Sequence, residues 1–281
     1  MNSGTVTGAA LSVATAGVWG AGDFAGGIAT LRANVFRVVA AAHACGLVLM
    51  LTLAWLTREP VPPLSSLYWG VVAGVAGAFG VAALYQGLAI GRMGMVAPVA
   101  SVLTAILPVL VGIRSEGTPG GLQLTGFALA LVSVWFVARP DGNIDSHRGL
   151  GLAVLAGVMF GLFLVAGRQA GHHGIFWPLV AARVASTLLM LIIVAFSSHD
   201  SRPLRLALVP ILLSGLFDSG ANALFIAATR HGRLDVAAVL SSLYPASTVI
   251  LARVLLKQRT SAMQNAGIVG ALVAVALISV R

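Results

Sequence analysis

The chain has 281 residues, of which 58% are hydrophobic and only 9% are charged, and its mean hydropathy is +0.98. In a soluble domain roughly a quarter of the residues are charged, so this composition excludes a water-soluble globular protein. The formal charge of +9 comes from basic residues scattered one or two to a loop. We expect them to lie at lipid head groups, and they form no basic face that would indicate a nucleic-acid partner.

Ten apolar segments follow one another, each with about the 20 residues that a helix needs to cross about 30 Å of hydrocarbon. They are expected at residues 8–30, 36–56, 67–90, 94–113, 122–138, 149–167, 174–197, 206–229, 235–253 and 263–280. Such continuous runs are unlike the alternating strands of about 10 residues that build membrane barrels. The sequence predicts an all-α membrane protein of about ten transmembrane helices, with short connections and a retained first helix.

The fourth segment shares a sequence pattern with the ninth. Residues 99–108 align with residues 236–245, and both stretches place a hydroxyl residue four positions before a mid-helix proline. These pairs are Thr104 with Pro108 and Ser241 with Pro245. Further matches in the same order pair Ala16-Gly17-Val18 with Ala156-Gly157-Val158, Arg37 with Arg183, Ala83-Leu84-Tyr85 with Ala223-Leu224-Phe225, and Gln123-x-x-Gly126 with Gln264-x-x-Gly267. Ordered matches across five helices predict an internal repeat.

Two homologous halves follow from this repeat, at residues 1–140 and 148–281, joined by the polar, turn-rich stretch 139–143. Each half has an odd number of helices, so the second must enter the membrane with the opposite orientation. Inverted five-helix repeats are typical of secondary transporters, whose substrate site lies near the middle of the membrane between the repeats.

These ordered motifs resemble the EamA-like, ten-helix branch of the drug/metabolite transporter superfamily. In that family a half typically closes with a proline-bearing fourth helix, a Gly-Glu-Arg-type turn, and Gln-x-x-Gly at the start of the fifth helix. Here the first turn holds Glu116 without an arginine, and Gln258 replaces the glutamate of the second turn. The resemblance covers the whole chain and implies export or import of small metabolites such as amino acids, nucleotide-related compounds or toxic organic molecules.

Two aspartates fall within apolar segments, Asp23 in the first and Asp218 in the eighth. An ionised carboxylate at the bilayer centre costs about 2.5 to 3.5 kcal/mol, so each is a hypothesis of function. Asp218 shares a helix face with Asn222, and Asp23 shares one with Trp19. We expect these faces to line a polar cavity, where either aspartate exchanges a proton or binds a cationic group. The alternative is that each only completes a packing network.

Further residues are expected near this cavity. The substrate-binding or coupling candidates are Tyr85, Gln86, Ser241 and Tyr244. Pro108 and Pro245 are expected to kink their helices beside the site and so to serve gating. Arg37 and Arg183 are candidate charge partners for an aspartate or a substrate carboxylate, or else they extend to the interface.

The chain lacks the sequence motifs of intramembrane or nucleotide-driven enzymes, and His172 and His173 have no further ligands at metal-binding spacing. We therefore expect no enzymatic activity, no metal and no cofactor. The sequence favours a secondary active transporter of a small metabolite, amino acid-like or a small organic compound, that works by alternating access. It is expected to be a proton-coupled exporter of the bacterial cytoplasmic membrane, and a homodimer is left open.

Two other functions stay open. One is a multidrug or organic-cation exporter in which Asp23 and Asp218 bind the cation. The other is a membrane structural or sensor protein that moves no solute.

Overall fold

The computed structural model describes residues 3–90, 93–137, 149–196, 203–255 and 261–279. All regular structure in these residues is helical. The helices are α1 (Ser3–Thr30), α2 (Val35–Leu56), α3 (Leu64–Ile90), α4 (Met93–Glu116), α5 (Gly121–Val137), α6 (Leu150–Ala170), α7 (Phe176–Phe196), α8 (Leu208–His231), α9 (Leu234–Ser241), α10 (Tyr244–Leu255) and α11 (Ala262–Ser279). A short 3-10 turn, Leu204–Ala207, precedes α8.

Within the described residues, each of the ten predicted segments overlaps a helix, and the ninth is divided between α9 and α10. Six helices, α2, α3, α4, α6, α7 and α8, are long and apolar enough to cross a membrane. Helices α5 and α11 are apolar but shorter. Helix α1 is long enough, with 28 residues, and it contains Asp23 and several serine and threonine side chains. The all-helical membrane fold is therefore confirmed. The predicted join at 139–143 and the turn that holds Gln258 lie outside the described residues.

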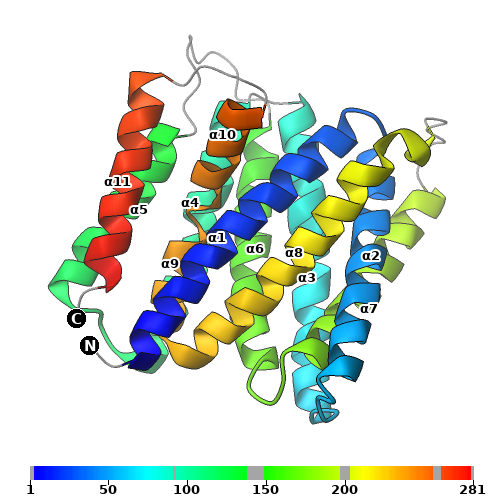
Figure 1. Ribbon diagram of the computed structural model, residues 1–281, viewed down its shortest axis with the longest axis horizontal. Helices are drawn as coiled ribbons and strands as arrows, with labels where there is room; N and C mark the ends of the chain where they lie inside the picture. The colour runs from blue at the N-terminus through cyan, green and yellow to red at the C-terminus, as the bar shows by residue number, and fades with distance from the viewer. Residues whose placement is uncertain (1–2, 91–92, 138–148, 197–202, 256–260, 280–281) are drawn as a thin grey trace.

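The helices stand side by side in one bundle, and helices far apart in the sequence are neighbours (Figure 1). Helix α1 packs along α8, and α3 packs along α6. Helices α2 and α3 both contact α7, while α4 contacts α6 and α9, and α1 contacts α9 and α10. Helices α5 and α11 pair at one side of the bundle. The first helix begins, and the last ends, at the same end of the bundle (Figure 1), which we call the termini end.

Glycines allow the closest of these approaches, as is usual in membrane bundles. A methyl group added to Gly70 or Gly74 of α3 would lie 2.4 Å or 2.1 Å from a carbonyl oxygen of α7. The glycine face of α3 is thus covered by α7 of the same chain. On α1, Gly22 and Gly26 lie against α8, with the Cβ position of Gly22 only 3.3 Å from the Asp218 nitrogen.

The two Gln-x-x-Gly motifs open α5 and α11, and their residues have matching roles. The Gln123 side chain accepts a hydrogen bond from the Gly120 nitrogen, and the Gln264 side chain accepts one from the Ser261 nitrogen. In each case an amide side chain satisfies a backbone donor at the start of a helix. The glycines, Gly126 and Gly267, each lie where a methyl group would collide with the end of the partner helix.

Candidate functional site

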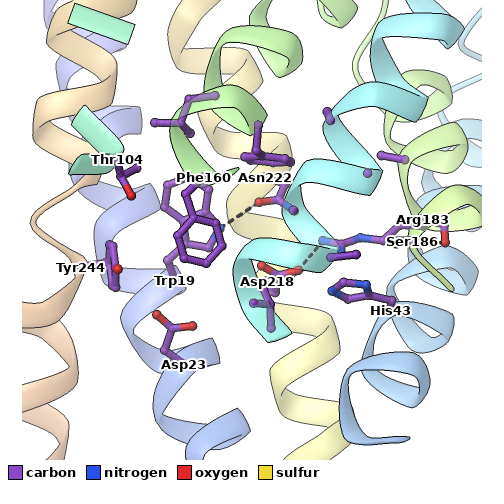
Figure 2. A pocket seen from close by; sticks show the side chains of 18 residues that line it. Trp19, Asp23, His43, Thr104, Phe160, Arg183, Ser186, Asp218, Asn222 and Tyr244 are labelled. Carbon is purple, nitrogen blue, oxygen red and sulfur yellow. Dashed lines mark hydrogen bonds and ion pairs between the residues drawn. The ribbon is translucent and has the colours of Figure 1, made fainter. Parts of the chain in front are cut away.

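A cavity lies near the middle of the bundle and is lined by helices from both ends of the chain (Figure 2). Its volume is about 60 Å³, room for a few water molecules. Its polar lining residues are Trp19, Asp23, His43, Thr104, Arg183, Ser186, Asp218, Asn222 and Tyr244. Its apolar and small lining residues are Ala73, Gly74, Gly77, Ala78, Val81, Phe160, Phe163, Leu164 and Ala182. We call this space the central cavity.

Trp19 joins α1 to α8 at the cavity. Its indole nitrogen donates a hydrogen bond of 2.8 Å to the side-chain oxygen of Asn222, a residue 4% exposed. The indole also stacks on Phe225, with ring centroids 5.8 Å apart, and meets Phe163 edge to face at 6.3 Å. These contacts hold the indole in one orientation, with a hydrogen bond at one end and aromatic rings around it.

Asp218 forms an ion pair with Arg183 of α7 through the Nη2 atom of the guanidinium (Figure 2). The arginine side chain is only 6% exposed, whereas the aspartate side chain is 26% exposed. The pair lies near the middle of α8, where an unpaired charge would be costly to bury. The aspartate therefore keeps access to the cavity while the arginine is fixed among the helices.

Several polar atoms of the lining have no hydrogen-bond partner among the described residues. They are His43 Nδ1, Arg183 Nε and Tyr244 Oη, and each side chain belongs to a residue at most 6% exposed. Ser219 Oγ, which is not on the lining, also has no partner among the described residues, and it faces Gly46 as Arg183 Nε does. Buried polar groups are nearly always satisfied, so this cluster indicates a site for a ligand or for water.

Asp23 lies across the cavity from Arg183, toward Tyr244 (Figure 2). It interacts electrostatically with Asp218, Tyr85 and Tyr244. The Tyr85 hydroxyl comes from α3 and lies close to Gly26, one helical turn after Asp23. Asp23 is therefore surrounded by hydroxyls and by a second carboxylate.

The structure brings together most of the residues predicted for the site. Those on the cavity lining are Trp19, Asp23, Arg183, Asp218, Asn222 and Tyr244. Tyr85 is buried with its hydroxyl beside Gly26, and Ser241 is buried with its hydroxyl 3.4 Å from the Ser12 carbonyl oxygen. Gln86 and Arg37 are half-buried and are not part of the lining. Arg183 and Arg37, predicted to be equivalent, thus lie in different environments.

The two matched prolines differ in their surroundings. Helix α4 continues through Pro108, whereas the ninth segment is interrupted at Ser242 and Leu243, just before Pro245. The Ser242 carbonyl in this break accepts a hydrogen bond of 2.5 Å from the Ser101 hydroxyl of α4. The break places Tyr244, the first residue of α10, at the cavity.

Sequence reasoning missed His43 as a lining residue, because a single histidine in an apolar segment is more often a core residue. It also missed Ser186, which lies on the Arg183 side of the cavity, and the aromatic wall of Phe160 and Phe163. Only the serine left a signal, since it follows Arg183 by three residues and so shares its helix face.

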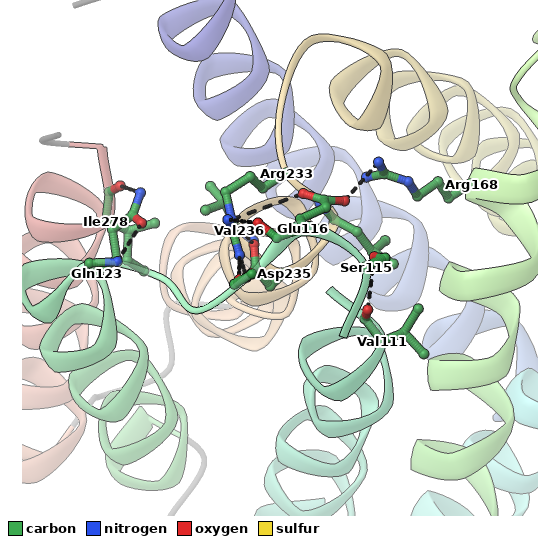
Figure 3. Close-up of polar contacts among 12 residues, drawn as sticks. Val111, Ser115, Glu116, Gln123, Arg168, Arg233, Asp235, Val236 and Ile278 are labelled. Carbon is green, nitrogen blue, oxygen red and sulfur yellow. Dashed lines mark hydrogen bonds and ion pairs between the residues drawn. The ribbon is translucent and has the colours of Figure 1, made fainter. Parts of the chain in front are cut away.

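A second group of charges lies at the termini end (Figure 3). We call Glu116, Arg168, Arg233 and Asp235 the end cluster. Arg168 contacts the Glu116 carboxylate at 2.7 Å, and Arg233 binds the Asp235 carboxylate through Nε at 3.0 Å and Nη2 at 2.7 Å. Hydrogen bonding to Asp235 raises the pKa of Arg233 above its usual range. The turn at the end of α4 holds Glu116 without the arginine that is typical of the family's turn. Arg168 of α6 and Arg233, just before α9, contact Glu116 instead.

Comparison with known proteins gives one family. The model of the EamA-like transporter family matches residues 147–280. No curated protein sequence matches the chain. A solved structure, titled only "Crystal structure of protein", has a TM-score of 0.78 at 18% sequence identity and covers 96% of this chain and 95% of its own. That likeness supports the fold alone.

The family match agrees with the resemblance predicted from the motifs and is consistent with the drug/metabolite transporter superfamily. Members of this family are transporters, and the apolar helices make the chain a multi-pass integral membrane protein. Residues 147–280 of the chain are thus similar to the EamA-like transporter family, whose members are broadly transporters of small solutes.

Proposed function

We propose that the chain is a secondary active transporter that exports a small metabolite, amino acid-like or a small organic compound, by alternating access. Export is coupled to proton movement across the bacterial cytoplasmic membrane. The observation that carries this proposal is the central cavity, in which α1 of the first half contributes Trp19 and Asp23 and α8 of the second half contributes Asp218 and Asn222. A mid-bundle polar site between two halves is the usual arrangement of such transporters.

Helix pairing supports two inverted repeats at residues 1–140 and 148–281. In such repeats α1 corresponds to α6, α2 to α7, α3 to α8, α4 to α9 together with α10, and α5 to α11. The contact between α1 and α8 is then equivalent to the contact between α6 and α3. By the same correspondence, the contact of α4 with α6 is equivalent to the contacts of α9 and α10 with α1. The contact of α3 with α7 is equivalent to that of α8 with α2. Helix α1 begins at the termini end whereas α6 ends there (Figure 1), as opposite orientation requires.

Alternating access follows from the position of the cavity between these repeats. Rocking of one half against the other would open the cavity first to one side and then to the other. The break between α9 and α10 lies at the cavity wall, beside Tyr244 and Pro245, and faces the unbroken α4 with Pro108. We propose that Pro245 and Pro108 serve this movement, the first as a hinge and the second as a bend.

Proton coupling is supported by the nearness of Asp23 to Asp218. Repulsion between two carboxylates in a small cavity is relieved when one of them takes up a proton. Movement of that proton to the other side of the membrane would couple the cavity to the proton gradient. Asp23 is the better candidate for this role, because Asp218 already has Arg183 as its partner.

A second candidate is an organic-cation exporter, favoured by the two carboxylates, Asp23 and Asp218, on the lining of one cavity. Here Asp23 would bind the cation directly. The two candidates differ in whether a solute without a positive charge is bound. A structural or sensor protein, the third candidate, would move no solute at all.

Flux measurements with purified protein in liposomes test the proposal. Solutes that raise the thermal unfolding temperature are selected first, and their flux is measured with and without a pH gradient. We expect the gradient to accelerate flux in the parent protein, and Asp23→Asn to remove that acceleration. Asp145→Asn, in the stretch between the halves, is the matched carboxylate control and should behave as the parent. Unchanged flux and unchanged pH dependence in both Asp23→Asn and Asp218→Asn would refute the coupling.

A further inference from the structure

Arg183 carries the permanent positive charge among the described residues that line the central cavity. Its side chain is 6% exposed and is held between α7 and α8. An arginine can donate five hydrogen bonds from a planar fork, which matches the two oxygens of a carboxylate. In this structure one ion-pair contact, from Nη2, reaches Asp218, while Nε has no partner among the described residues. The guanidinium is therefore incompletely used by its own chain.

His43 and Ser186 line the cavity beside Arg183. Arg183 Nε and Ser219 Oγ both face Gly46 of α2, where a methyl group would be 3.2 Å from Nε and 1.9 Å from the hydroxyl, so this side of the guanidinium is closely packed. His43 faces the same part of the cavity (Figure 2), and its Nδ1 is also without a partner among the described residues. A neutral apolar ligand would leave these groups unsatisfied, whereas a carboxylate would accept from them.

Asp218 is the exchangeable member of the pair. Its side chain is 26% exposed, about four times the exposed fraction of Arg183. It also interacts with Asp23, so its present position places two carboxylates near each other. Once released from Arg183, Asp218 could accept hydrogen bonds from a positively charged group of a ligand. The exchange would thus convert an internal ion pair into two ligand contacts.

We propose that Arg183 is the carboxylate-binding residue of the cavity, and that a solute carboxylate takes the place of Asp218 on its guanidinium. The preferred solutes are then zwitterions, which bind in a state with a wider cavity than the present one of about 60 Å³, with the ammonium group between Asp218 and Asp23 and an apolar side chain against Phe160 and Phe163. This inference rests on the proposed transport function, because it assigns the solute class to the same site.

Three probes with one apolar body test the exchange: leucine, 4-methylpentanoate, which is leucine without the amino group, and 3-methylbutylamine, which is leucine without the carboxylate. Equilibrium binding is measured in detergent by quenching of tryptophan fluorescence and by thermal shift. In the parent protein we expect leucine to bind more tightly than either of the other probes. A preference for 3-methylbutylamine over leucine would overturn the proposal and favour the organic-cation exporter.

Two variants separate exchange from a structural role. Asp218→Asn frees the guanidinium, so 4-methylpentanoate should bind about tenfold more tightly, while leucine binding weakens. Arg183→Gln frees the aspartate, so 3-methylbutylamine should bind more tightly, while leucine and 4-methylpentanoate lose about tenfold or more. Arg32→Gln, an exposed arginine that donates to the Leu206 carbonyl at a helix end, is the matched control and should leave all three affinities unchanged.

A merely structural ion pair would make both variants weaken all three probes alike, and that result would refute the exchange. Failure of every probe to bind at millimolar concentration would refute it as well. If Arg183→Gln does not fold, Arg183→Lys keeps the charge and should retain carboxylate binding at lower affinity. Binding is independent of flux, so a protein that shows the opposed pattern but moves no solute would contradict transport and not the exchange.

Discussion

The end cluster and the central cavity both place arginine beside carboxylates, but they satisfy the arginine differently. In the end cluster Arg233 binds both oxygens of Asp235 and also donates to the carbonyl oxygens of Glu116 and Gly117. In the cavity, Arg183 has a single ion-pair contact with Asp218, and its Nε has no partner among the described residues. The exposed fraction of the carboxylate differs too, 0% for Asp235 against 26% for Asp218.

This difference shows what each region can do. A buried carboxylate that receives several hydrogen bonds from one arginine stabilises a turn between helices, and it has little reason to release its partner. An aspartate that faces a cavity and makes one ion-pair contact with its arginine is more open to replacement by a ligand. We therefore interpret the end cluster as a structural contact among α4, α6 and α9, and the cavity pair as part of the binding site.

The largest expected effect tests the structural side of this comparison. Arg233→Ala leaves the fully buried Asp235 carboxylate without its partner, which should lower the free energy of unfolding by about 3 kcal/mol. Thermal unfolding in detergent measures this loss, and Arg230→Ala, an exposed neighbour, is the control. An unfolding temperature equal to that of the parent would contradict the structural role of the end cluster.

A smaller effect is expected from the packing of α1 beside the cavity. At Gly26 a methyl group would lie 2.0 Å from the Tyr85 hydroxyl oxygen, whereas at Gly27 nothing lies within 4 Å. Gly26→Ala should therefore lower the free energy of unfolding by about 1 to 3 kcal/mol and weaken solute binding. Gly27→Ala, the next residue, should be neutral or slightly stabilising. Equal behaviour of the two variants would show that Tyr85 moves freely and does not shape the cavity.

The smallest effect concerns the indole of Trp19. Trp19→Phe keeps an aromatic ring near Phe225 but removes the donor to Asn222, leaving a buried amide oxygen without that bond. We expect a loss of about 1 kcal/mol in stability and a weaker binding of solute, measured by chemical unfolding and thermal shift. Trp55→Phe, at a position 78% exposed, serves as the comparison, and a loss of the same size there would show that the hydrogen bond contributes nothing.

The helical segments could be predicted from the sequence, because the thickness of the hydrocarbon core sets a nearly fixed apolar length for each of them. It also located Asp23, Asp218 and Asn222 on faces that meet at the cavity, since charged and amide groups must avoid lipid. The sequence suggested both Arg183 and Arg37 as partners of an aspartate. It could not decide between them, because it does not show which helices are neighbours. The same limit hid His43 and the aromatic wall, whose residue types are common in packed cores.

The end cluster was not predicted, because its members come from turns that are far apart in the sequence. Arg168 and Arg233 were expected to lie at lipid head groups, yet both contact Glu116, at 2.7 Å and 4.0 Å. A basic residue near a helix end is compatible with either environment. Only the meeting of α4, α6 and the α8 to α9 turn at the termini end decides between them.

Alternating access requires a cavity that opens to both sides of the membrane. Accessibility of Ser186→Cys, in a background with Cys45→Ser, can be measured by labelling vesicles with a membrane-impermeant thiol reagent from either side. We predict labelling of Ser186→Cys from both sides and labelling of Ser115→Cys, an exposed residue at the termini end, from one side. Labelling of Ser186→Cys from one side only, or from neither, would contradict alternating access.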